Sequence, residues 1–291
     1  MVIMEQGPYV LAGYDGSDGA VRALRWAVEE ARLRRRPLIV CHAWRWPYPE
    51  KPADEDVLRT VRLMGENVLE RGVSRVHSQA PGLTVHSRLV TGAPTACLLN
   101  EAREAEVIVL GSHGSGGFPG LAAGSAALQV PAHAPCPVVI VHPFEIIRPR
   151  VVVGVDGSPS ADAALGFGFE QAALRGWELQ AVYGCWELPA TADAYRSSRP
   201  DMEALKRTAG ARLERAVSLW REKYPHVPAW TRLRLEEPRQ ALLSAAEQAG
   251  LLVVGDRGGG GLPGMRLGAV TEAMLRQASC PVAVVPSRHR D

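Results

Sequence analysis

Lysine is scarce in this chain of 291 residues. Only three of its 33 basic residues are lysines, at Lys51, Lys206 and Lys223, and the other 30 are arginines. No glycine precedes any of the three, so the sequence lacks the Gly-Lys-Ser/Thr of a Walker A phosphate loop. A phosphate site in this chain therefore has to use backbone N–H groups, hydroxyls or arginines.

Paired cysteines and long apolar runs are also missing. The five cysteines, at positions 41, 97, 136, 185 and 280, are odd in number and form no C-x-x-C pair. The sequence thus suggests neither a disulfide framework nor a zinc site. No apolar run approaches the ~20 residues of a membrane span, and the first residues do not resemble a signal peptide. We expect a cytoplasmic protein with free thiols, no metal and no membrane partner.

The chain has no large excess of positive charge. Residues 1–146 carry 14 basic and 15 acidic side chains, and residues 147–291 carry 19 and 16. This balance argues against nucleic acid as a partner. The basic run at 32–36 closes a predicted helix, where cations suit the helix dipole, so we interpret it as a solvated helix end.

The sequence repeats itself after about 140 residues. AEVIVLGSHGSGGFPG (105–120) returns as AGLLVVGDRGGGGLPG (249–264), and APCPVVIV (134–141) returns as ASCPVAVV (278–285). The offset is 141 residues between Asp15 and Asp156, and 144 between Gly111 and Gly255. This self-similarity predicts two homologous domains, 1–146 and 147–291, that pack against each other across a short connection.

Each repeat alternates β-branched runs with amphipathic stretches, which is typical of an α/β domain with a mainly parallel sheet flanked by helices. In the first repeat we predict strands at 10–15, 38–43, 83–90, 107–111 and 138–142, and helices at 17–33, 56–71, 94–104 and 125–133. The Pro-rich segments 45–56 and 187–201 are predicted to be exposed loops.

Two short patterns lie where a ligand would bind. Gly-x-Asp-Gly-Ser stands at the carboxyl end of the first strand, at 13–17 and 154–158. Its aspartate can bind a ribose or a base at the carboxyl edge of the sheet, or it can simply help to cap the next helix. After the fourth strand, two glycines three residues apart are followed by nine residues and then Gly-Ser (124–125) or Gly-Ala (268–269). Such a loop favours anion binding by backbone N–H groups, and a flexible turn is the alternative.

Together, the G-2x-G-9x-G-(S/T) loop, the D-G-S sequence and the closing C-P-V strands resemble the universal stress protein family in its tandem form, over residues 8–146 and 147–286. The resemblance implies two Rossmann-like domains, each with a five-stranded sheet in the order 3-2-1-4-5. It also implies ATP or another adenine nucleotide in each competent domain, with or without Mg²⁺, and association through the last strand.

The resemblance assigns Asp15 to the ribose or adenine, the Ala43 backbone to the adenine, and the start of the last helix to the phosphates. The nucleotide-binding residues of the first repeat would be Gly13, Tyr14, Asp15, Ala43, Leu110, Gly111, His113, Gly114, Gly124, Ser125 and Ala126. Those of the second repeat would be Gly154, Val155, Asp156, Cys185, Val254, Gly255, Arg257, Gly258, Gly268, Ala269 and Val270. Among the histidines, we expect only His113 to reach a ligand.

The second repeat departs from this pattern. Ala269 lacks the hydroxyl of Ser125, a loss for which Thr271 and Arg266 are the candidates to compensate. Leu-Glu-Glu-Pro (235–238) stands where the first repeat has Thr-Gly-Ala-Pro (91–94), which brings two glutamates toward an anion site. The second site is therefore expected to be the weaker one.

These features favour an ATP-binding regulator or sensor of the stress response over a catalyst, because no general base or metal-binding carboxylate pair accompanies the loop. The resemblance implies at most slow hydrolysis. Two alternatives stay open: a nucleotide-dependent transferase or ATPase that uses Asp15 or His113, and a structural dimer with vestigial sites. We expect the closing strands, 136–141 and 280–285, to join the repeats, with homodimerisation beyond that.

Overall fold

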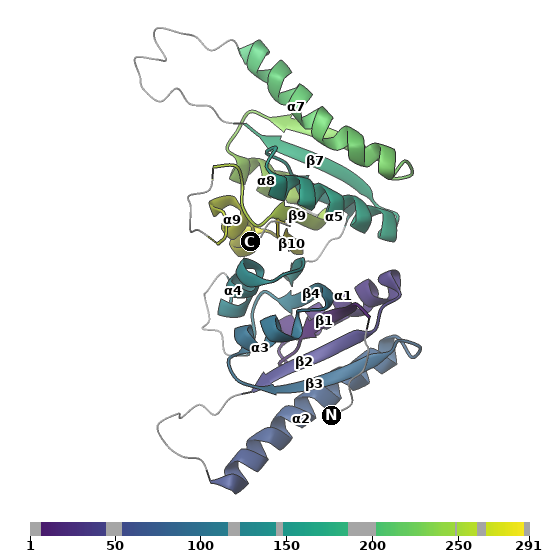
Figure 1. The fold of residues 1–291 in the computed structure, drawn as a ribbon, viewed down its shortest axis with the longest axis vertical. Coiled ribbons are helices and arrows are strands. Elements are labelled where there is room, and N and C mark those ends of the chain that lie inside the picture. Colours follow the sequence, from purple (N-terminus) through teal and green to yellow (C-terminus); the bar gives the residue numbers. More distant parts are fainter. Residues whose placement is uncertain are drawn as a thin grey trace, which may run out of the picture. The chain divides into compact units, whose positions relative to one another are not determined.

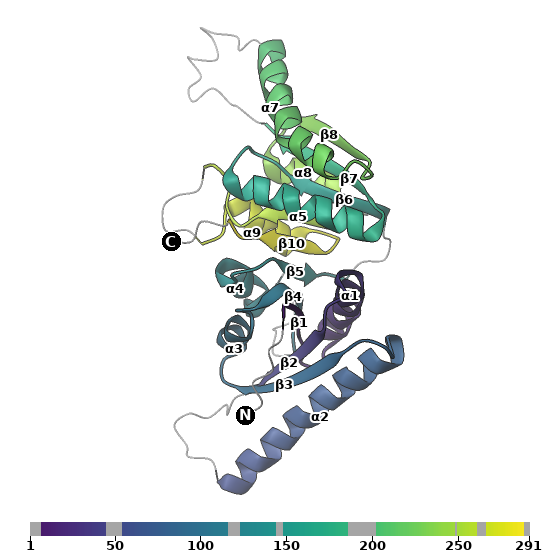
Figure 2. The same cartoon turned by 45° about the vertical axis from the view of Figure 1, so that its right-hand side comes forward.

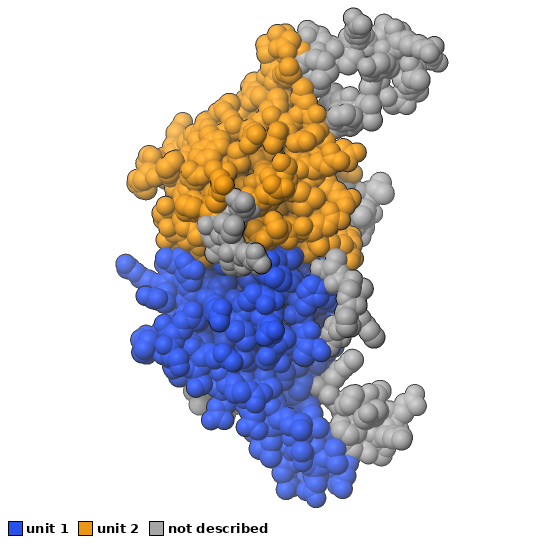
Figure 3. All heavy atoms as spheres, turned by 180° about the vertical axis from the view of Figure 1, so that it is seen from behind, with its two compact units in different colours: residues 1–143 blue, residues 144–291 orange. Residues whose placement is uncertain are grey.

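The chain forms two compact units, residues 1–143 and 144–291 (Figure 3). The structure is a computed structural model, and it describes residues 7–44, 54–115, 123–143, 148–185, 202–247, 249–260 and 266–287. The Pro-rich segment 187–201 and residues 45–53 of the first Pro-rich segment lie outside these ranges.

Unit 1 is an α/β sandwich around one parallel sheet. Its strands lie in the order β3-β2-β1-β4-β5, and the four neighbouring pairs are all parallel. The predicted order is therefore confirmed (Figure 1). The elements are β1 (Tyr9–Gly13), α1 (Asp18–Arg34), β2 (Leu38–Trp44), α2 (Glu55–Gln79), β3 (Val85–Thr91), α3 (Pro94–Glu101), β4 (Ala105–Gly111), α4 (Ser125–His133) and β5 (Val138–Val141).

The central strands of unit 1 are apolar because helices cover both faces of the sheet. Nearly every residue of β1, β4 and β5 is buried, as expected for continuous apolar runs in a parallel sheet. Helices α1 and α2 lie on one face, and α3 and α4 lie on the other (Figure 2). The chain thus leaves β1 and β4 toward opposite faces, which makes their carboxyl ends the place where a crevice opens.

Unit 2 repeats this architecture. Its strands lie in the order β8-β7-β6-β9-β10, again with parallel neighbours. The elements are β6 (Arg148–Gly154), α5 (Pro159–Arg175), β7 (Glu178–Gly184), α7 (Met202–Lys223), β8 (Ala229–Arg234), α8 (Pro238–Ala246), β9 (Ala249–Gly255), α9 (Ala269–Gln277) and β10 (Val282–Val285). How the closing strands β5 and β10 pair outside their own units stays a prediction.

The largest difference from the predicted elements is in α2, which continues to Gln79, eight residues beyond the predicted end. Gly72 lies inside the helix, where a Cβ would come within 2.9 Å of the Tyr14 ring, so glycine lets α2 pack closely against the turn after β1. Beyond it, Val76 is fully buried and anchors the last turns. The prediction was also wrong for α3, which ends at Glu101.

Candidate functional site

The D-G-S sequence of unit 1 forms a tight turn that starts α1. Gly16 has a φ of 80°, a left-handed conformation that favours glycine. Asp15 Oδ1 accepts hydrogen bonds from the Ser17 backbone N–H at 3.0 Å and from the Ser17 hydroxyl at 2.6 Å. The Ser17 Oγ in turn accepts a hydrogen bond from the Ala20 N–H at 3.2 Å, so Ser17 is the N-cap of α1.

The second carboxylate oxygen of Asp15 reaches across to the loop after β4. Asp15 Oδ2 accepts a hydrogen bond from the Ser115 backbone N–H at 2.5 Å. A Cβ on Gly114 would lie 2.6 Å from the same oxygen, so the loop can approach this closely only because residue 114 is glycine. Asp15 therefore joins the ends of two neighbouring strands, β1 and β4.

Asp15 is held in its ionised form. Burial raises the pKa of its carboxyl, but the hydrogen bonds from Ser17 and Ser115 outweigh burial and hold the pKa below its ordinary value. At neutral pH the carboxylate is a fixed negative charge that keeps the backbone of the glycine-rich loop in place.

The start of α4 faces the same edge of the sheet. Gly124 is the N-cap, and its own N–H donates to the Ser112 carbonyl at 2.8 Å. No side chain caps this helix, so the N–H groups of its first turn and the Ser125 hydroxyl remain for an incoming anion. The positive end of the helix dipole adds to that attraction.

A cavity of about 680 Å³ opens between these elements. All eleven residues assigned to nucleotide binding in the first repeat line it, from Gly13 at the end of β1 to Ala126 in the first turn of α4. The volume lies within the range of ligand pockets, roughly 300–1,000 Å³. The sequence patterns therefore converge on one place in the fold.

Half of the cavity wall was not predicted. Its other residues come from α1, the end of β2, α3 and the residue before it, the loop after β4, and α4: Ala20, Cys41, His42, Ala93, Pro94, Thr95, Leu98, Ser112, Ser115, Ala127 and Gln129. The residues at the end of β2 could have been predicted, because β2 lies beside β1 in a parallel sheet and the carboxyl ends of adjacent strands share an edge.

A second histidine joins His113 in the wall of the cavity. His42 also lines the cavity, since it is the third residue from the end of β2. Its Nδ1 lies 2.8 Å from the Tyr14 carbonyl oxygen, which ties β2 to the turn after β1. His113 Nδ1 lies 3.1 Å from the Ser112 Oγ, so the predicted histidine is also held by a neighbour.

Unit 2 preserves the aspartate turn. Asp156 accepts hydrogen bonds from the Ser158 N–H at 2.9 Å and from the Gly259 N–H at 2.8 Å. A Cβ on Gly258 would lie 2.7 Å from Asp156 Oδ2, as close as in unit 1. The other residues assigned to nucleotide binding in unit 2 lie at the ends of strands, just after strands, or at the start of α9: Gly154, Val155, Cys185, Val254, Gly255, Arg257, Gly268, Ala269 and Val270.

The anion side of unit 2 differs from that of unit 1. Asp256, with no exposed surface, replaces Ser112 and accepts a hydrogen bond from the Ser160 hydroxyl at 2.8 Å. The Thr271 hydroxyl donates to the Gly255 carbonyl at 2.7 Å, and its side chain is buried. Thr271 was a candidate to replace the Ser125 hydroxyl, but its own hydroxyl is already engaged inside the unit. Asp256 Oδ2 also lies 4.0 Å from the Arg257 Nε, so a carboxylate–guanidinium pair stands beside this loop where unit 1 has a serine and a histidine.

One of the two glutamates expected near this site is already paired. The Glu236 carboxylate lies 3.4 Å from the Arg234 guanidinium. Glu237 is the N-cap residue of α8. Among the described residues, no group of three or more His, Cys, Asp or Glu side chains could hold a metal ion.

Comparison with known proteins explains the shared architecture of the two units. The model of the universal stress protein family matches residues 9–142 and 148–286. The chain belongs to this family. Universal stress protein Rv2623 of Mycobacterium tuberculosis is 33% identical over 288 residues, which span 94% of this chain and 95% of the relative.

Other relatives extend over similar lengths. Universal stress protein Rv2005c of M. tuberculosis is 34% identical over 301 residues, covering 94% of this chain and 96% of its own. A crystal structure of a universal stress protein from Archaeoglobus fulgidus superposes with a TM-score of 0.69 at 21% identity, covering 97% of this chain and 98% of that one. The tandem arrangement of two family domains is therefore shared along the whole chain.

The thiols of this universal stress protein are expected to react slowly while it is folded. All five cysteines are free, and burial raises the pKa of Cys41, Cys136 and Cys280 to about 12. Their thiolate fraction at pH 8 should thus be about a thousandfold below that of an ordinary cysteine.

Labelling with a disulfide reagent, followed by peptide mass spectrometry, measures this reactivity. Rapid labelling of all five thiols in urea and slow labelling of these three in buffer are expected. Rapid native labelling of Cys41 or Cys280, each about 1% exposed, would contradict the packing described above.

Proposed function

We propose that unit 1 binds ATP in the cavity at the carboxyl ends of β1 and β4, and that occupancy of this site makes the protein a nucleotide-dependent regulator. The observation that carries the proposal is the convergence of eleven assigned residues on one cavity that ends at an uncapped helix N-terminus. Backbone N–H groups, a hydroxyl and a helix dipole suit the phosphates of a nucleotide.

The available donors are sufficient for useful affinity without lysine. Micromolar binding requires about 8 kcal/mol, and each hydrogen bond to a charged phosphate contributes roughly 1.5–3 kcal/mol. The first turn of α4, the Ser125 hydroxyl and the backbone near Gly114 offer several such bonds. The apolar walls, which include Leu98 and Leu110, would hold the base.

The site supports binding and release better than rapid turnover. Among the residues that line the cavity, Asp15 is the one acidic residue, and its carboxylate already accepts hydrogen bonds from Ser17 and Ser115. Mg²⁺, where present, would arrive with the nucleotide and be held through its phosphates. We place this role in the cytoplasm, because five free thiols suit a reducing compartment.

Isothermal titration of the full chain with ATP and with adenosine tests the proposal. We expect one tight site per chain for ATP, in unit 1, and much weaker binding of adenosine, because the phosphates supply most of the contacts. Absence of ATP binding would favour a structural dimer with vestigial sites. Steady-state hydrolysis above about 1 s⁻¹ would favour an enzyme, and sedimentation with and without ATP would report on homodimerisation.

Removing the Ser125 hydroxyl is expected to weaken ATP binding about tenfold or more. Ser125→Ala makes unit 1 resemble unit 2, where Ala269 begins α9, and one hydroxyl to a charged phosphate is worth roughly 1.5–3 kcal/mol. Ser74→Ala, on the exposed surface of α2, is the matched control and should leave the affinity unchanged. Equal affinities of Ser125→Ala and the parent would show that the hydroxyl does not contact the nucleotide.

A further inference from the structure

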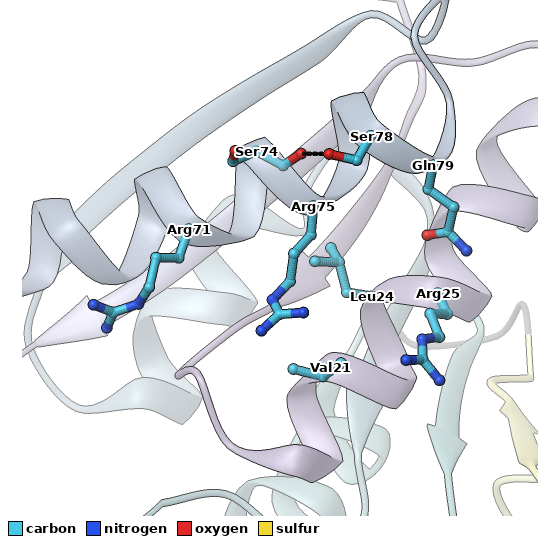
Figure 4. Close-up of a pocket in the computed structure, with 8 residues that line it drawn as sticks. All are labelled: Val21, Leu24, Arg25, Arg71, Ser74, Arg75, Ser78 and Gln79. Carbon is cyan, nitrogen blue, oxygen red and sulfur yellow. Dashed lines mark hydrogen bonds between the residues drawn. The ribbon is translucent and has the colours of Figure 1, made fainter.

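A second cavity of unit 1 lies away from the nucleotide site, between α1 and α2. It has a volume of about 600 Å³ and is lined by Val21, Leu24, Arg25, Arg71, Ser74, Arg75, Ser78 and Gln79. Arg75 extends from α2 toward Val21 and Leu24 of α1, and Arg71 lies beside it on α2 (Figure 4). The cavity, which we call the arginine groove, thus has an apolar floor and cationic walls.

The cations of the arginine groove have no counter-ions within the described residues. Arg25, Arg71 and Arg75 are exposed, and none of them forms an ion pair with a carboxylate of the described chain. No Asp or Glu lines the groove. Because unit 1 as a whole has almost balanced charge, this gathering of unpaired arginines is a local feature.

The corresponding place in unit 2 is filled by aromatic rings. The Val76 carbonyl accepts a hydrogen bond from the Ala80 N–H, and the Trp220 carbonyl accepts one from the Tyr224 N–H, which places Trp220 at the position of Val76. The Trp220 ring would lie 2.5 Å from a Cβ on Gly166, the residue that corresponds to Arg25. Its Nε1 also donates to the Asp162 carboxylate at 2.9 Å.

The rest of this aromatic group completes the filling. Phe169 stacks on Trp220 and Tyr224 with ring centroids 6.5 and 5.9 Å apart, and Val28 and Ala80 stand in the places of Phe169 and Tyr224 in unit 1. One fold within one chain therefore has a packed space in unit 2 and an open cationic space in unit 1. The groove is open because unit 1 has small side chains at positions 28, 76 and 80, where unit 2 has aromatic rings. The two units do not differ in fold at this place.

The arginine groove extends toward the end of α1. A hollow of about 570 Å³, lined by Ala31, Arg32, Arg35, Arg36, Pro37 and residues 79–84, adjoins it at Gln79. Arg36 pairs with Glu106 at 2.8 Å, whereas Arg32 and Arg35 have no ion-pair partner among the described residues. Arg25 and Arg32 lie two turns apart on α1, a rise of about 10 Å, so the unpaired cations form a line and not a compact cluster.

We propose that the arginine groove is a docking site for an acidic, amphipathic segment of a partner protein. A line of guanidinium groups matches successive carboxylates, which arginine binds with two parallel hydrogen bonds. The apolar part of the groove at Val21, which is partly exposed, matches apolar side chains on the other face of the segment. A single phosphate-bearing small molecule would engage one end of this line only. The proposal does not depend on nucleotide binding.

Fluorescence anisotropy with two labelled peptides tests the docking site on the full chain. In the first peptide, Glu and Leu occupy opposite faces of a helix, and in the second every Glu is replaced by Gln. We expect the Glu peptide to bind in low salt and the Gln peptide to bind at least about tenfold more weakly. Failure of the Glu peptide to bind, or equal binding of both peptides, would overturn the proposal.

Variants then locate the binding surface. The triple variant Arg25→Gln, Arg71→Gln, Arg75→Gln should weaken the Glu peptide about tenfold or more. The control is a second triple variant, Arg59→Gln, Arg62→Gln, Arg103→Gln, which removes the same charge at exposed positions outside the groove. This variant should change peptide binding less than about twofold. Equal losses in the two triples would show nonspecific attraction and overturn the proposal.

A steric variant gives an independent check. Arg25→Gly with Val76→Trp copies the Gly166 and Trp220 pair of unit 2 and should abolish peptide binding while ATP affinity stays unchanged. Retained peptide binding in this folded variant would place the peptide elsewhere. If tripolyphosphate binds the groove and the Glu peptide does not, the proposal is overturned, and the groove is a site for a compact anion instead.

Discussion

Gly114→Val is expected to lower the ATP affinity of unit 1 about a hundredfold or more. A Cβ at this position would lie 2.6 Å from Asp15 Oδ2, so the loop after β4 or the Asp15 carboxylate that holds it would have to move. Loss of two backbone hydrogen bonds to phosphate, at roughly 1.5–3 kcal/mol each, accounts for that magnitude. Titration calorimetry with ATP measures it.

Gly258→Val is the matched control for this variant. Its Cβ would lie 2.7 Å from Asp156 Oδ2, so it disturbs unit 2 in the same way while unit 1 stays intact. Gly82→Val, where no atom lies within 4 Å of the added Cβ, controls for valine at an open glycine. Parental affinity in Gly114→Val, with its fold verified by circular dichroism, would mean that the glycine-rich loop does not bind the phosphates.

Asp15→Asn is expected to destabilise unit 1 by about 1–3 kcal/mol at pH 7. The carboxylate accepts hydrogen bonds from Ser17 on one oxygen and from Ser115 on the other. An amide has one oxygen only, so its NH₂ group would face a backbone N–H donor. Urea unfolding gives the free energy, and hydrogen exchange of β1 and β4 peptides assigns the transition to unit 1.

The effect of this substitution should depend on pH in a defined direction. The folded pKa of Asp15 lies below its unfolded value, so its stabilisation is present above the ordinary pKa of about 3.9 and is lost as pH falls through the folded pKa. The stability gap between the parent and Asp15→Asn should be constant from pH 6 to 8 and shrink below about pH 4. Asp18→Asn, an exposed residue of the first turn of α1, should show little change. A gap that widens toward acid would contradict the hydrogen-bond network.

Much of the fold could be predicted because the sequence contains the same pattern of strands, helices and motifs in two repeats. The repeated strands and the D-G-S and glycine patterns indicate two α/β domains, and the strand order implied by the family resemblance is confirmed in both units. Parallel strands buried on both faces leave a strong apolar signal, as in β4. Helix ends were predicted less well, since α2 continues past Arg71 through a glycine that packs against Tyr14.

The details of the site could not be predicted from spacing. The contact between Asp15 and Ser115 joins residues 100 positions apart, and no local pattern names that partner. The buried carboxylate of Asp256 occurs in a sequence that suggests only a glycine-rich turn. The arginine groove depends on which side chains of α2 meet α1, so it emerges only when the two helices are placed together.

Native mass spectrometry of the full chain with ATP tests the central claim most directly. The parent and Gly258→Val should each retain one ATP at low micromolar concentration, and Gly114→Val should retain none. ATP retained by Gly114→Val and lost from Gly258→Val would place the nucleotide in unit 2, and a parent that retains no ATP would contradict the assignment of the cavity.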